Sequence, residues 1–301
     1  MGICDGRVVI VTGAGRGIGR EEALLFAAEG AKVVVNDLGK EADGSGEMQP
    51  VAQQVVDDIV AAGGEAIANT DDVSDWEGAQ RLINTAVETF GGLDVLVNNA
   101  GILRDRMLVN MTEEERDAVI KVHLKGTFAP SRWAAAYWRE RSKAGETNVA
   151  RIVNTSSSSG IYANPGQTNY GAAKSGIATF TQIAAKELKN YGVVANAIAP
   201  GARTRMTESL MAGRGRPEPK PDEFDRSNPA NVAPLVVWLG SPLCEVTGQV
   251  FNVSGGMVGV AESWGRGPAQ DKGDRWVPSE LTDIVPKLVE QARPAPGLGG
   301  G

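Results

Sequence analysis

The sequence predicts an α/β fold in which a doubly wound parallel sheet of about seven strands carries helices on both faces. Short apolar, β-branched runs alternate along the chain with longer stretches of helical period. Several runs, such as VVIV and KVVV, lack polar alternation, which is typical of strands covered on both faces. A glycine-rich segment, TGAGRGIG, directly follows the first run, where a strand would turn into a helix. This order predicts right-handed βαβ units.

Each predicted strand is a short apolar run: residues 7–12, 32–37, 65–70, 93–98, 150–155, 193–198 and 249–253. Each predicted helix repeats Ala, Leu or Val at helical spacing: residues 18–29, 51–62, 76–90, 112–143, 168–190 and, despite Pro286, 278–292. The charged, Pro-rich run 213–223 predicts a loop, and the glycine-rich end predicts disorder. We therefore expect one domain over residues 1–262 and a tail over residues 263–301.

Composition excludes several classes of function. A net charge of −7 and a pI near 5.0 are atypical of proteins that neutralise phosphates, so we expect no nucleic-acid partner. The start MGICDGRVVIV does not resemble a signal peptide, and no apolar run reaches about 18 residues, so we expect neither secretion nor membrane insertion. Cys4 and Cys244 lie far apart without metal-ligand spacing. We expect no disulfide and no metal, and a reducing, cytoplasmic setting.

The glycine-rich segment predicts a dinucleotide site. Gly13 permits a tight turn, Gly17 lets the backbone approach a pyrophosphate, and Gly19 allows close helix packing, with the helix N-terminus facing the phosphates. A glycine-rich turn without a ligand is the alternative for this segment alone. Asp37 ends the second run 18 residues after Gly19, where its carboxylate can accept hydrogen bonds from ribose hydroxyls. The alternative for Asp37 is a turn former, which Leu38 and the glycine after it would suit.

Three residues predict the chemistry. Tyr170 follows Ser157 by thirteen residues, and Lys174 lies one helical turn beyond Tyr170 on the same face. A tyrosine hydroxyl with a pKa of about 10 needs a neighbouring cation to favour the phenolate, and Lys174 can supply it. In this hypothesis Ser157 binds the substrate oxygen, and Tyr170 takes the alcohol proton while hydride passes to a nicotinamide whose ribose Lys174 holds. The alternative is a chance Tyr-Lys spacing beside a serine-rich loop.

Five motifs in this order resemble the short-chain dehydrogenase/reductase family. They are TGAGRGIG, NNAG at residues 98–101, Ser157, YGAAK at residues 170–174 and a Pro-Gly turn at residues 200–201, and the resemblance covers roughly residues 5–260. It implies a Rossmann-type fold, with residues 198–204 over the nicotinamide and Asp72 and Val73 at the adenine. The other cofactor-binding residues that we expect are Gly13, Arg16, Gly17, Ile18, Gly19, Asp37, Leu38, Asn99, Ala100, Gly101, Tyr170, Lys174, Pro200, Gly201 and Thr204.

Within the family, the stretches VVVNDLG, NNAGILRDRML, VHLKGTF and SGIYANPGQTNYGAAK resemble the dehydrogenase unit of peroxisomal multifunctional β-oxidation enzymes. The resemblance implies a (3R)-hydroxyacyl-CoA substrate oxidised with NAD, and hydroxysteroids as further candidates. His123 replaces the asparagine of most members. We expect it to support Lys174 through a water or a backbone carbonyl, and the alternative is a packing histidine. Arg16 occupies a position that is often basic in NADP-using relatives, but Asp37 would repel a 2′-phosphate, so we predict NAD.

Two other functions stay open. The first is a 3-oxoacyl-thioester reductase that uses NADPH on a carrier protein, and the second is a dinucleotide-binding regulator without turnover. We expect substrate contacts between Arg205 and Asn228. There, Arg214, Arg216 and Lys220 would either meet CoA phosphates or belong to a solvated loop. By resemblance, helices 112–143 and 168–190 should form a homo-oligomer, a dimer or a tetramer, and the apolar IATFTQIAAKEL supports this.

Overall fold

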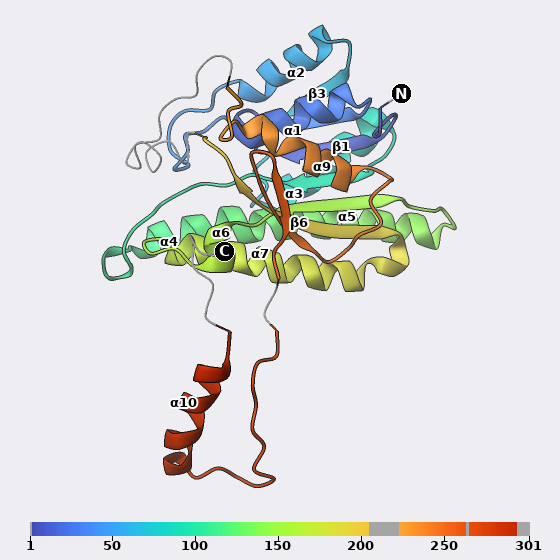
Figure 1. The fold of residues 1–301 in the computed structure, drawn as a ribbon. Helices are drawn as coiled ribbons and strands as arrows, with labels where there is room; N and C mark the ends of the chain where they lie inside the picture. Colours follow the sequence, from blue (N-terminus) through green and yellow to red (C-terminus); the bar gives the residue numbers. More distant parts are fainter. Residues whose placement is uncertain (1, 205–222, 263–264, 294–301) are drawn as a thin grey trace. The chain divides into compact units, whose positions relative to one another are not determined.

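The computed structural model describes residues 2–204, 223–262 and 265–293 and contains one eight-stranded sheet (Figure 1). The strands are β1 Val8–Thr12, β2 Lys32–Asn36, β3 Glu65–Asn69, β4 Val95–Asn98, β5 Ala150–Thr155, β6 Val193–Gly201, β7 Val250–Ser254 and β8 Met257–Val260. Their order is β3-β2-β1-β4-β5-β6-β7-β8, and all neighbours pair parallel except β7 and β8. The order reverses direction between β1 and β4, which is where ligands bind in open α/β sheets.

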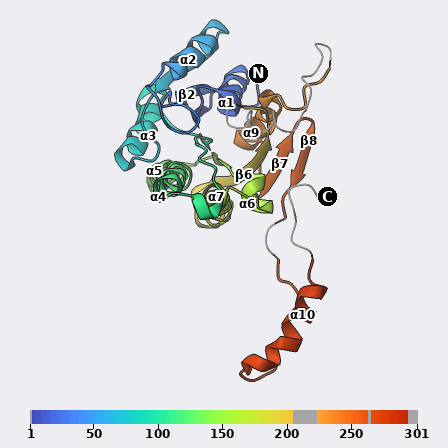
Figure 2. The same cartoon turned by 90° about the vertical axis from the view of Figure 1, so that its left-hand side faces the viewer.

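Helices cover both faces of the sheet (Figure 2). The helices of the first unit are α1 Gly17–Ala28, α2 Val51–Ala61, α3 Trp76–Phe90, α4 Glu113–Ile120, α5 Gly126–Lys143, α6 Ser158–Tyr162, α7 Thr168–Glu187 and α9 Ala233–Gly240. One core lies beneath α1, α2 and α9, and the other lies beneath α3, α5 and α7. In β1, Val9 and Val11 face the first core while Val8 and Ile10 face the second, so the strand has no polar face. The predicted fold class is confirmed.

The predicted helix over residues 112–143 is three segments. Thr112 and Glu115 form a capping box at the start of α4. A π-helical turn, Lys121–Lys125, then separates α4 from α5 and contains His123. Such turns are frequent at functional sites because the extra residue redirects side chains. The uninterrupted apolar spacing of the sequence gave no sign of this insertion.

Helices α6 and α9 and strand β8 were not predicted. Helix α9 has the sequence APLVVWLG, which is apolar on its exposed side as well as on its buried side, so it lacks the one-sided period that marks a helix. Strand β8 is only four residues long and pairs with β7 as a hairpin. It adds an antiparallel eighth strand to the seven that the sequence predicted.

The chain divides into two compact units, Met1–Ala261 and Glu262–Gly301. The second contains α10 Leu281–Gln291, which includes Pro286 and follows a short 3₁₀ turn, Pro278–Glu280. The predicted loop at residues 213–223, apart from Glu223, and the predicted disordered end fall outside the described residues. Among the described residues, every helix is too short or too polar to cross a membrane.

Candidate active site

The glycine-rich turn connects β1 to α1 at the sheet's reversal point and contacts the NNAG segment. Gly13 has φ +64°, and a Cβ there would lie 2.7 Å from the Ala100 Cα, so no larger residue fits. The Asn99 side chain donates to the Thr12 and Gly13 carbonyls at 3.0 and 3.1 Å. The Thr12 hydroxyl accepts from the Asn99 and Ala100 amides at 3.0 and 3.1 Å. The turn and the NNAG segment therefore form one rigid edge.

The predicted phosphate-binding residues lie at the start of α1. Gly17, Ile18 and Gly19 form its first turn, and no side chain caps this end among the described residues. The first amides of a helix point out of its end and favour an anion. A Cβ on Gly17 would come within 3.4 Å of the Thr204 side chain, so the segment after β6 closes over this turn. The arrangement fits a pyrophosphate.

Asp37 follows β2, and its two oxygens have different partners. Oδ2 accepts from the Gly15 amide at 2.9 Å, and Oδ1 accepts from the Gly39 amide at 2.7 Å. The carboxylate therefore forms a turn and also contacts the glycine-rich segment. Leu38 is half-buried beside it. Arg16 donates instead to the Gln49 side chain at 2.7 Å.

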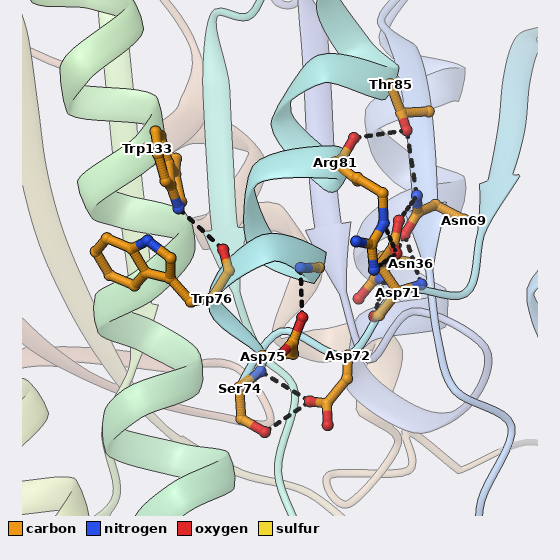
Figure 3. A network of polar contacts seen from close by, with 11 residues as sticks. Asn36, Asn69, Asp71, Asp72, Ser74, Asp75, Trp76, Arg81, Thr85 and Trp133 are labelled. Atoms are coloured by element: carbon orange, nitrogen blue, oxygen red, sulfur yellow. Dashed lines mark hydrogen bonds and ion pairs between the residues drawn. The ribbon is translucent and has the colours of Figure 1, made fainter.

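Polar contacts organise the ends of β2 and β3, where the resemblance implies adenine binding (Figure 3). The Asn36 amide donates to the Asn69 side chain at 2.8 Å and to the Asp71 carbonyl at 2.9 Å. Asp72 accepts from the amide and hydroxyl of Ser74 at 2.8 and 2.6 Å, as Figure 3 shows, and Val73 is buried. The sequence reasoning missed Asn36, Asn69 and Asp71. Their signal was an asparagine at the end of each of two adjacent predicted strands.

Ser157, Tyr170 and Lys174 come together at the carboxyl ends of β5 and β6. Ser157 precedes α6, and its hydroxyl accepts from the Ser159 amide at 3.1 Å and is hydrogen-bonded to Tyr170. Tyr170 and Lys174 lie on α7, with the Lys174 Nζ 5.6 Å from the centre of the Tyr170 ring. Lys174 donates to the Thr155 carbonyl at 2.6 Å. The predicted spacing thus produces a compact group.

Burial controls the charge of this group. Desolvation raises the pKa of Tyr170 to about 12, although the hydrogen bond from Ser157 opposes the rise. Desolvation also lowers the pKa of Lys174 to about 7. Both shifts favour neutral forms because the surrounding protein solvates charge poorly. The Lys174 ammonium is therefore only marginally stable at neutral pH, and a further contact with this residue can change its protonation.

His123 lies beneath Tyr170. Its side chain is 1% exposed, and the ring centres are 5.1 Å apart with the rings nearly perpendicular. The His123 Nε2 is 2.7 Å from the Ile102 carbonyl oxygen, whereas Lys174 uses the Thr155 carbonyl. Burial and the Lys174 charge lower the pKa of His123, so the imidazole is neutral. A Cβ on Gly101 would lie 2.2 Å from the His123 ring, so this histidine needs glycine there.

The Nδ1 atom of His123 is buried and has no hydrogen-bond partner among the described residues. A purely packing histidine normally has both ring nitrogens satisfied. His123 and Lys174 contact different backbone carbonyls, those of Ile102 and Thr155. The predicted support of Lys174 by His123 therefore stays a prediction.

Pro200 and Gly201 are the last two residues of β6 and pair with Val253 and Ser254 of β7. They therefore belong to the sheet and do not form the predicted turn. Arg203 and Asp225 form an ion pair at 2.7 Å across the following segment. Residues 205–222, which include most of the predicted substrate contacts with Arg214, Arg216 and Lys220, lie outside the described residues.

Amide side chains just before Tyr170 join α7 to the loop after β4. Gln167 donates to Asp105 at 2.7 Å, and Asn169 donates to the Arg104 carbonyl at 2.9 Å. The Asp105 charge raises the pKa of Tyr170, which places this carboxylate within electrostatic reach of the site. Sequence reasoning missed these residues, and their only signal was the pair of amides within three positions of Tyr170.

The sheet, the glycine-rich turn at its reversal point and the adjoining Ser-Tyr-Lys group define the class of dinucleotide-binding α/β oxidoreductases. Residues 7–215 match the family model described as short chain dehydrogenase. The chain therefore belongs to the short-chain dehydrogenase family, whose members bind a nicotinamide dinucleotide, and it is an oxidoreductase acting on CH–OH groups.

Individual relatives support this assignment. Hydroxyacyl-CoA dehydrogenase ChsB1 of Mycobacterium tuberculosis is 45% identical over 290 residues, which cover 92% of this chain and 87% of that protein. Peroxisomal multifunctional enzyme type 2 of Mus musculus is 46% identical over 255 residues, which cover 85% of this chain but 32% of that enzyme. The crystal structure of a short chain dehydrogenase from Mycobacterium avium is similar with a TM-score of 0.88 and 57% identity, covering 99% of this chain and 100% of that one. The predicted resemblance is confirmed.

Proposed function

We propose that this chain oxidises a 3-hydroxyacyl-CoA with NAD as hydride acceptor, and that hydroxysteroid-like alcohols are a second substrate class. The observation that carries the proposal is the convergence of Ser157, Tyr170 and Lys174 at the same end of the parallel sheet as the glycine-rich turn and Asp37. The name of the Mycobacterium tuberculosis relative, a hydroxyacyl-CoA dehydrogenase, supports the substrate class.

In the proposed mechanism, the alcohol loses a hydride from carbon and a proton from oxygen. The nicotinamide supplies the hydride-accepting carbon. Ser157 would hold the substrate oxygen, and the phenolate oxygen of Tyr170 would receive the proton and become the hydroxyl. Lys174 would hold the nicotinamide ribose and, when protonated, would favour the Tyr170 phenolate. His123 is neutral, and its buried Nδ1, which has no hydrogen-bond partner among the described residues, can accept a hydrogen bond.

The experiment is an NAD-reduction assay across 3-hydroxyacyl-CoA chain lengths, hydroxysteroids and terpene alcohols. We expect the highest kcat/KM with a (3R)-hydroxyacyl-CoA. Binding of NAD without turnover of any alcohol would instead favour a regulator. Preferred reduction of a 3-oxoacyl carrier protein with NADPH would favour the biosynthetic reductase.

We predict that NAD is preferred over NADP by at least about tenfold in kcat/KM, which corresponds to roughly 1.4 kcal/mol of transition-state binding. The 2′-phosphate would meet Asp37, whose hydrogen bonds to Gly15 and Gly39 prevent it from withdrawing. Asp37→Ala should reduce the difference in kcat/KM between NAD and NADP. Steady-state kinetics with both cofactors test this, and equal efficiency in the native enzyme would contradict it.

We also propose a homo-oligomer, supported by an apolar groove along α4, α5 and α7. The groove has a volume of about 910 Å³ and contains Leu124, Phe128 and Phe180. Glu113, Glu114 and Asp117 line one end, and Lys121 and Lys125 line the other. A second copy in antiparallel orientation would match acidic residues with basic ones. An isologous interface requires such self-complementarity.

Light scattering at micromolar concentration should therefore give two or four times the 31.6 kDa chain mass. Phe128→Asp should lower the mass, because Phe128 is 45% exposed in the groove. Val109→Asp is the matched control, since Val109 is 89% exposed but lies outside the groove. A native mass equal to one chain would contradict the proposal.

Two further proposals concern organisation and location. We propose that residues 1–262 form the dinucleotide-binding domain and that residues 263–301 form a C-terminal tail with one helix. We propose a cytoplasmic location, which the free, buried thiols of Cys4 and Cys244 support, since a reducing compartment keeps thiols unpaired.

A further inference from the structure

Arg16 lies next in the chain to Gly15, which contacts Asp37, the residue that we expect at the adenosine ribose. It directly follows Gly15, whose amide donates to Asp37, and it precedes the first residue of α1. An acidic residue in the Asp37 position binds a ribose 2′-hydroxyl, and an arginine nearby can instead accommodate a 2′-phosphate. The direction of the Arg16 side chain therefore bears on which dinucleotide the site selects.

The Arg16 guanidinium is directed to the segment between β2 and α2, residues 39–50. Its Nη2 donates to the Gln49 Oε1 at 2.7 Å, and its Nη1 makes a longer contact with the Lys40 carbonyl at 3.5 Å. Gln49 is a neutral acceptor, so it holds the guanidinium without cancelling its charge. The partner of Arg16 is thus an amide 33 residues away rather than the neighbouring Asp37.

The backbone of Gln49 is held firmly enough to serve as this anchor. Its amide donates to the Gly39 carbonyl at 3.1 Å, and its carbonyl accepts from the Val51 amide at 2.8 Å. Gly39 has φ +71°, and a Cβ there would lie 2.0 Å from the Gln49 carbonyl oxygen, so the contact requires glycine. Gly39 also donates to Asp37 at 2.7 Å. The same turn therefore positions Asp37 and Gln49.

The middle of the segment is also fixed. The Ala42 carbonyl accepts from the Leu103 amide at 3.0 Å, and the Asp43 carbonyl accepts from the Arg104 side chain at 3.1 Å. Residues 39–50 therefore connect β2 to α2 and are held in their middle by the loop after β4. A segment held in this way can keep Arg16 in one orientation.

We propose that Gln49 is a specificity-determining residue, which holds the Arg16 guanidinium on residues 39–50 and so withholds its counter-charge from a ribose 2′-phosphate. The inference rests on the proposed use of NAD. It explains how a chain with arginine at this position can still discriminate against the phosphorylated cofactor. Asp37 supplies repulsion, and Gln49 removes the compensating attraction.

The test is equilibrium binding, measured by isothermal titration calorimetry with 2′,5′-ADP and 5′-ADP as probes of the ribose edge. Gln49→Ala should improve the affinity for 2′,5′-ADP relative to 5′-ADP by about fivefold, as expected for releasing one surface hydrogen bond. Gln49→Glu should change the ratio in the opposite direction, because a carboxylate would bind Arg16 more tightly and repel the phosphate. Gln53→Ala is the matched control, since Gln53 is an exposed glutamine of α2 that pairs with Asp57.

A double-mutant cycle with Arg16→Ala separates this role from a general effect on the segment. Once Arg16 is absent, Gln49→Ala should leave the binding ratio unchanged. An unchanged ratio in Gln49→Ala alone, or an equal change with and without Arg16, would overturn the proposal. If native protein binds 2′,5′-ADP more tightly than 5′-ADP, the NAD assignment fails, while the coupling between Gln49 and Arg16 is still read from the cycle.

Discussion

Tyr170→Phe is expected to lower kcat by about 10²- to 10⁴-fold, the range of general acid-base groups, while cofactor affinity stays near the native value. The phenolate oxygen of Tyr170 is the only proton acceptor that we propose. The Tyr170 ring packs edge-on against His123, and the Lys174 Nζ lies 5.6 Å from the ring centre. Phenylalanine preserves both contacts and removes the hydroxyl alone.

Steady-state kinetics should be paired with NAD binding followed by fluorescence. Tyr162→Phe is a suitable control, because its hydroxyl accepts from Asn252 at 2.7 Å, outside the group of Ser157, Tyr170 and Lys174. It should retain activity within a few-fold. Near-native turnover in Tyr170→Phe would refute the mechanism, whereas loss of NAD affinity would indicate a structural role.

Glu22→Gln is expected to stabilise the protein increasingly as pH rises from about 5 to 8. The Glu22 side chain on α1 is fully buried, and neither carboxylate oxygen has a hydrogen-bond partner among the described residues. Burial raises its pKa from the ordinary 4.5 to about 8. Between these values the folded state binds more protons than the unfolded state. The free energy of unfolding therefore falls with rising pH, by up to about 1.4 kcal/mol per pH unit.

Glutamine has nearly the same shape and does not ionise, so the variant avoids this loss. We expect native and variant stabilities to differ least at pH 5 and the variant to gain on the order of 2–4 kcal/mol by pH 8. Urea unfolding at pH 5, 6, 7 and 8 measures the difference. Glu21→Gln is the control, since the neighbouring Glu21 is partly exposed and pairs with Arg20 at 2.7 Å. Parallel stability profiles for the native protein and Glu22→Gln would show that Glu22 is not desolvated in solution.

Local patterns predicted most of the fold. Seven strands were predicted because burial on both faces of a sheet demands continuous apolar runs, and β1 shows this directly. The prediction failed for elements whose apolar pattern does not reflect which residues are buried or how the helix is wound. Helix α9 is apolar around most of its circumference, and the π-helical turn at His123 is one extra residue within a regular helical spacing.

The residues of the candidate site also fall into a predictable and an unpredictable group. The glycine-rich turn, Ser157 and the Tyr170-Lys174 pair were predictable because each depends on backbone geometry over a few residues. The partners of these residues were not. Gln167 binds Asp105 across 62 positions, and no local spacing records such a contact.

By itself, the sequence determined the class of the protein, since strand periodicity, the glycine-rich turn and the helical Tyr-Lys spacing are local properties. Only the tertiary structure decided which groups lose water and which side chains meet. Lys174 is recognisable in the sequence as a cation, but burial lowers its pKa to about 7. Glu22 reads as an ordinary helix-surface acid, yet α1 buries it. In the sequence, Arg16 resembles a cation that could bind a phosphate, but in the structure its guanidinium donates a hydrogen bond to Gln49. Desolvation and long-range pairing depend on how the whole sheet orders its strands and helices, which is why they appear only in the folded chain.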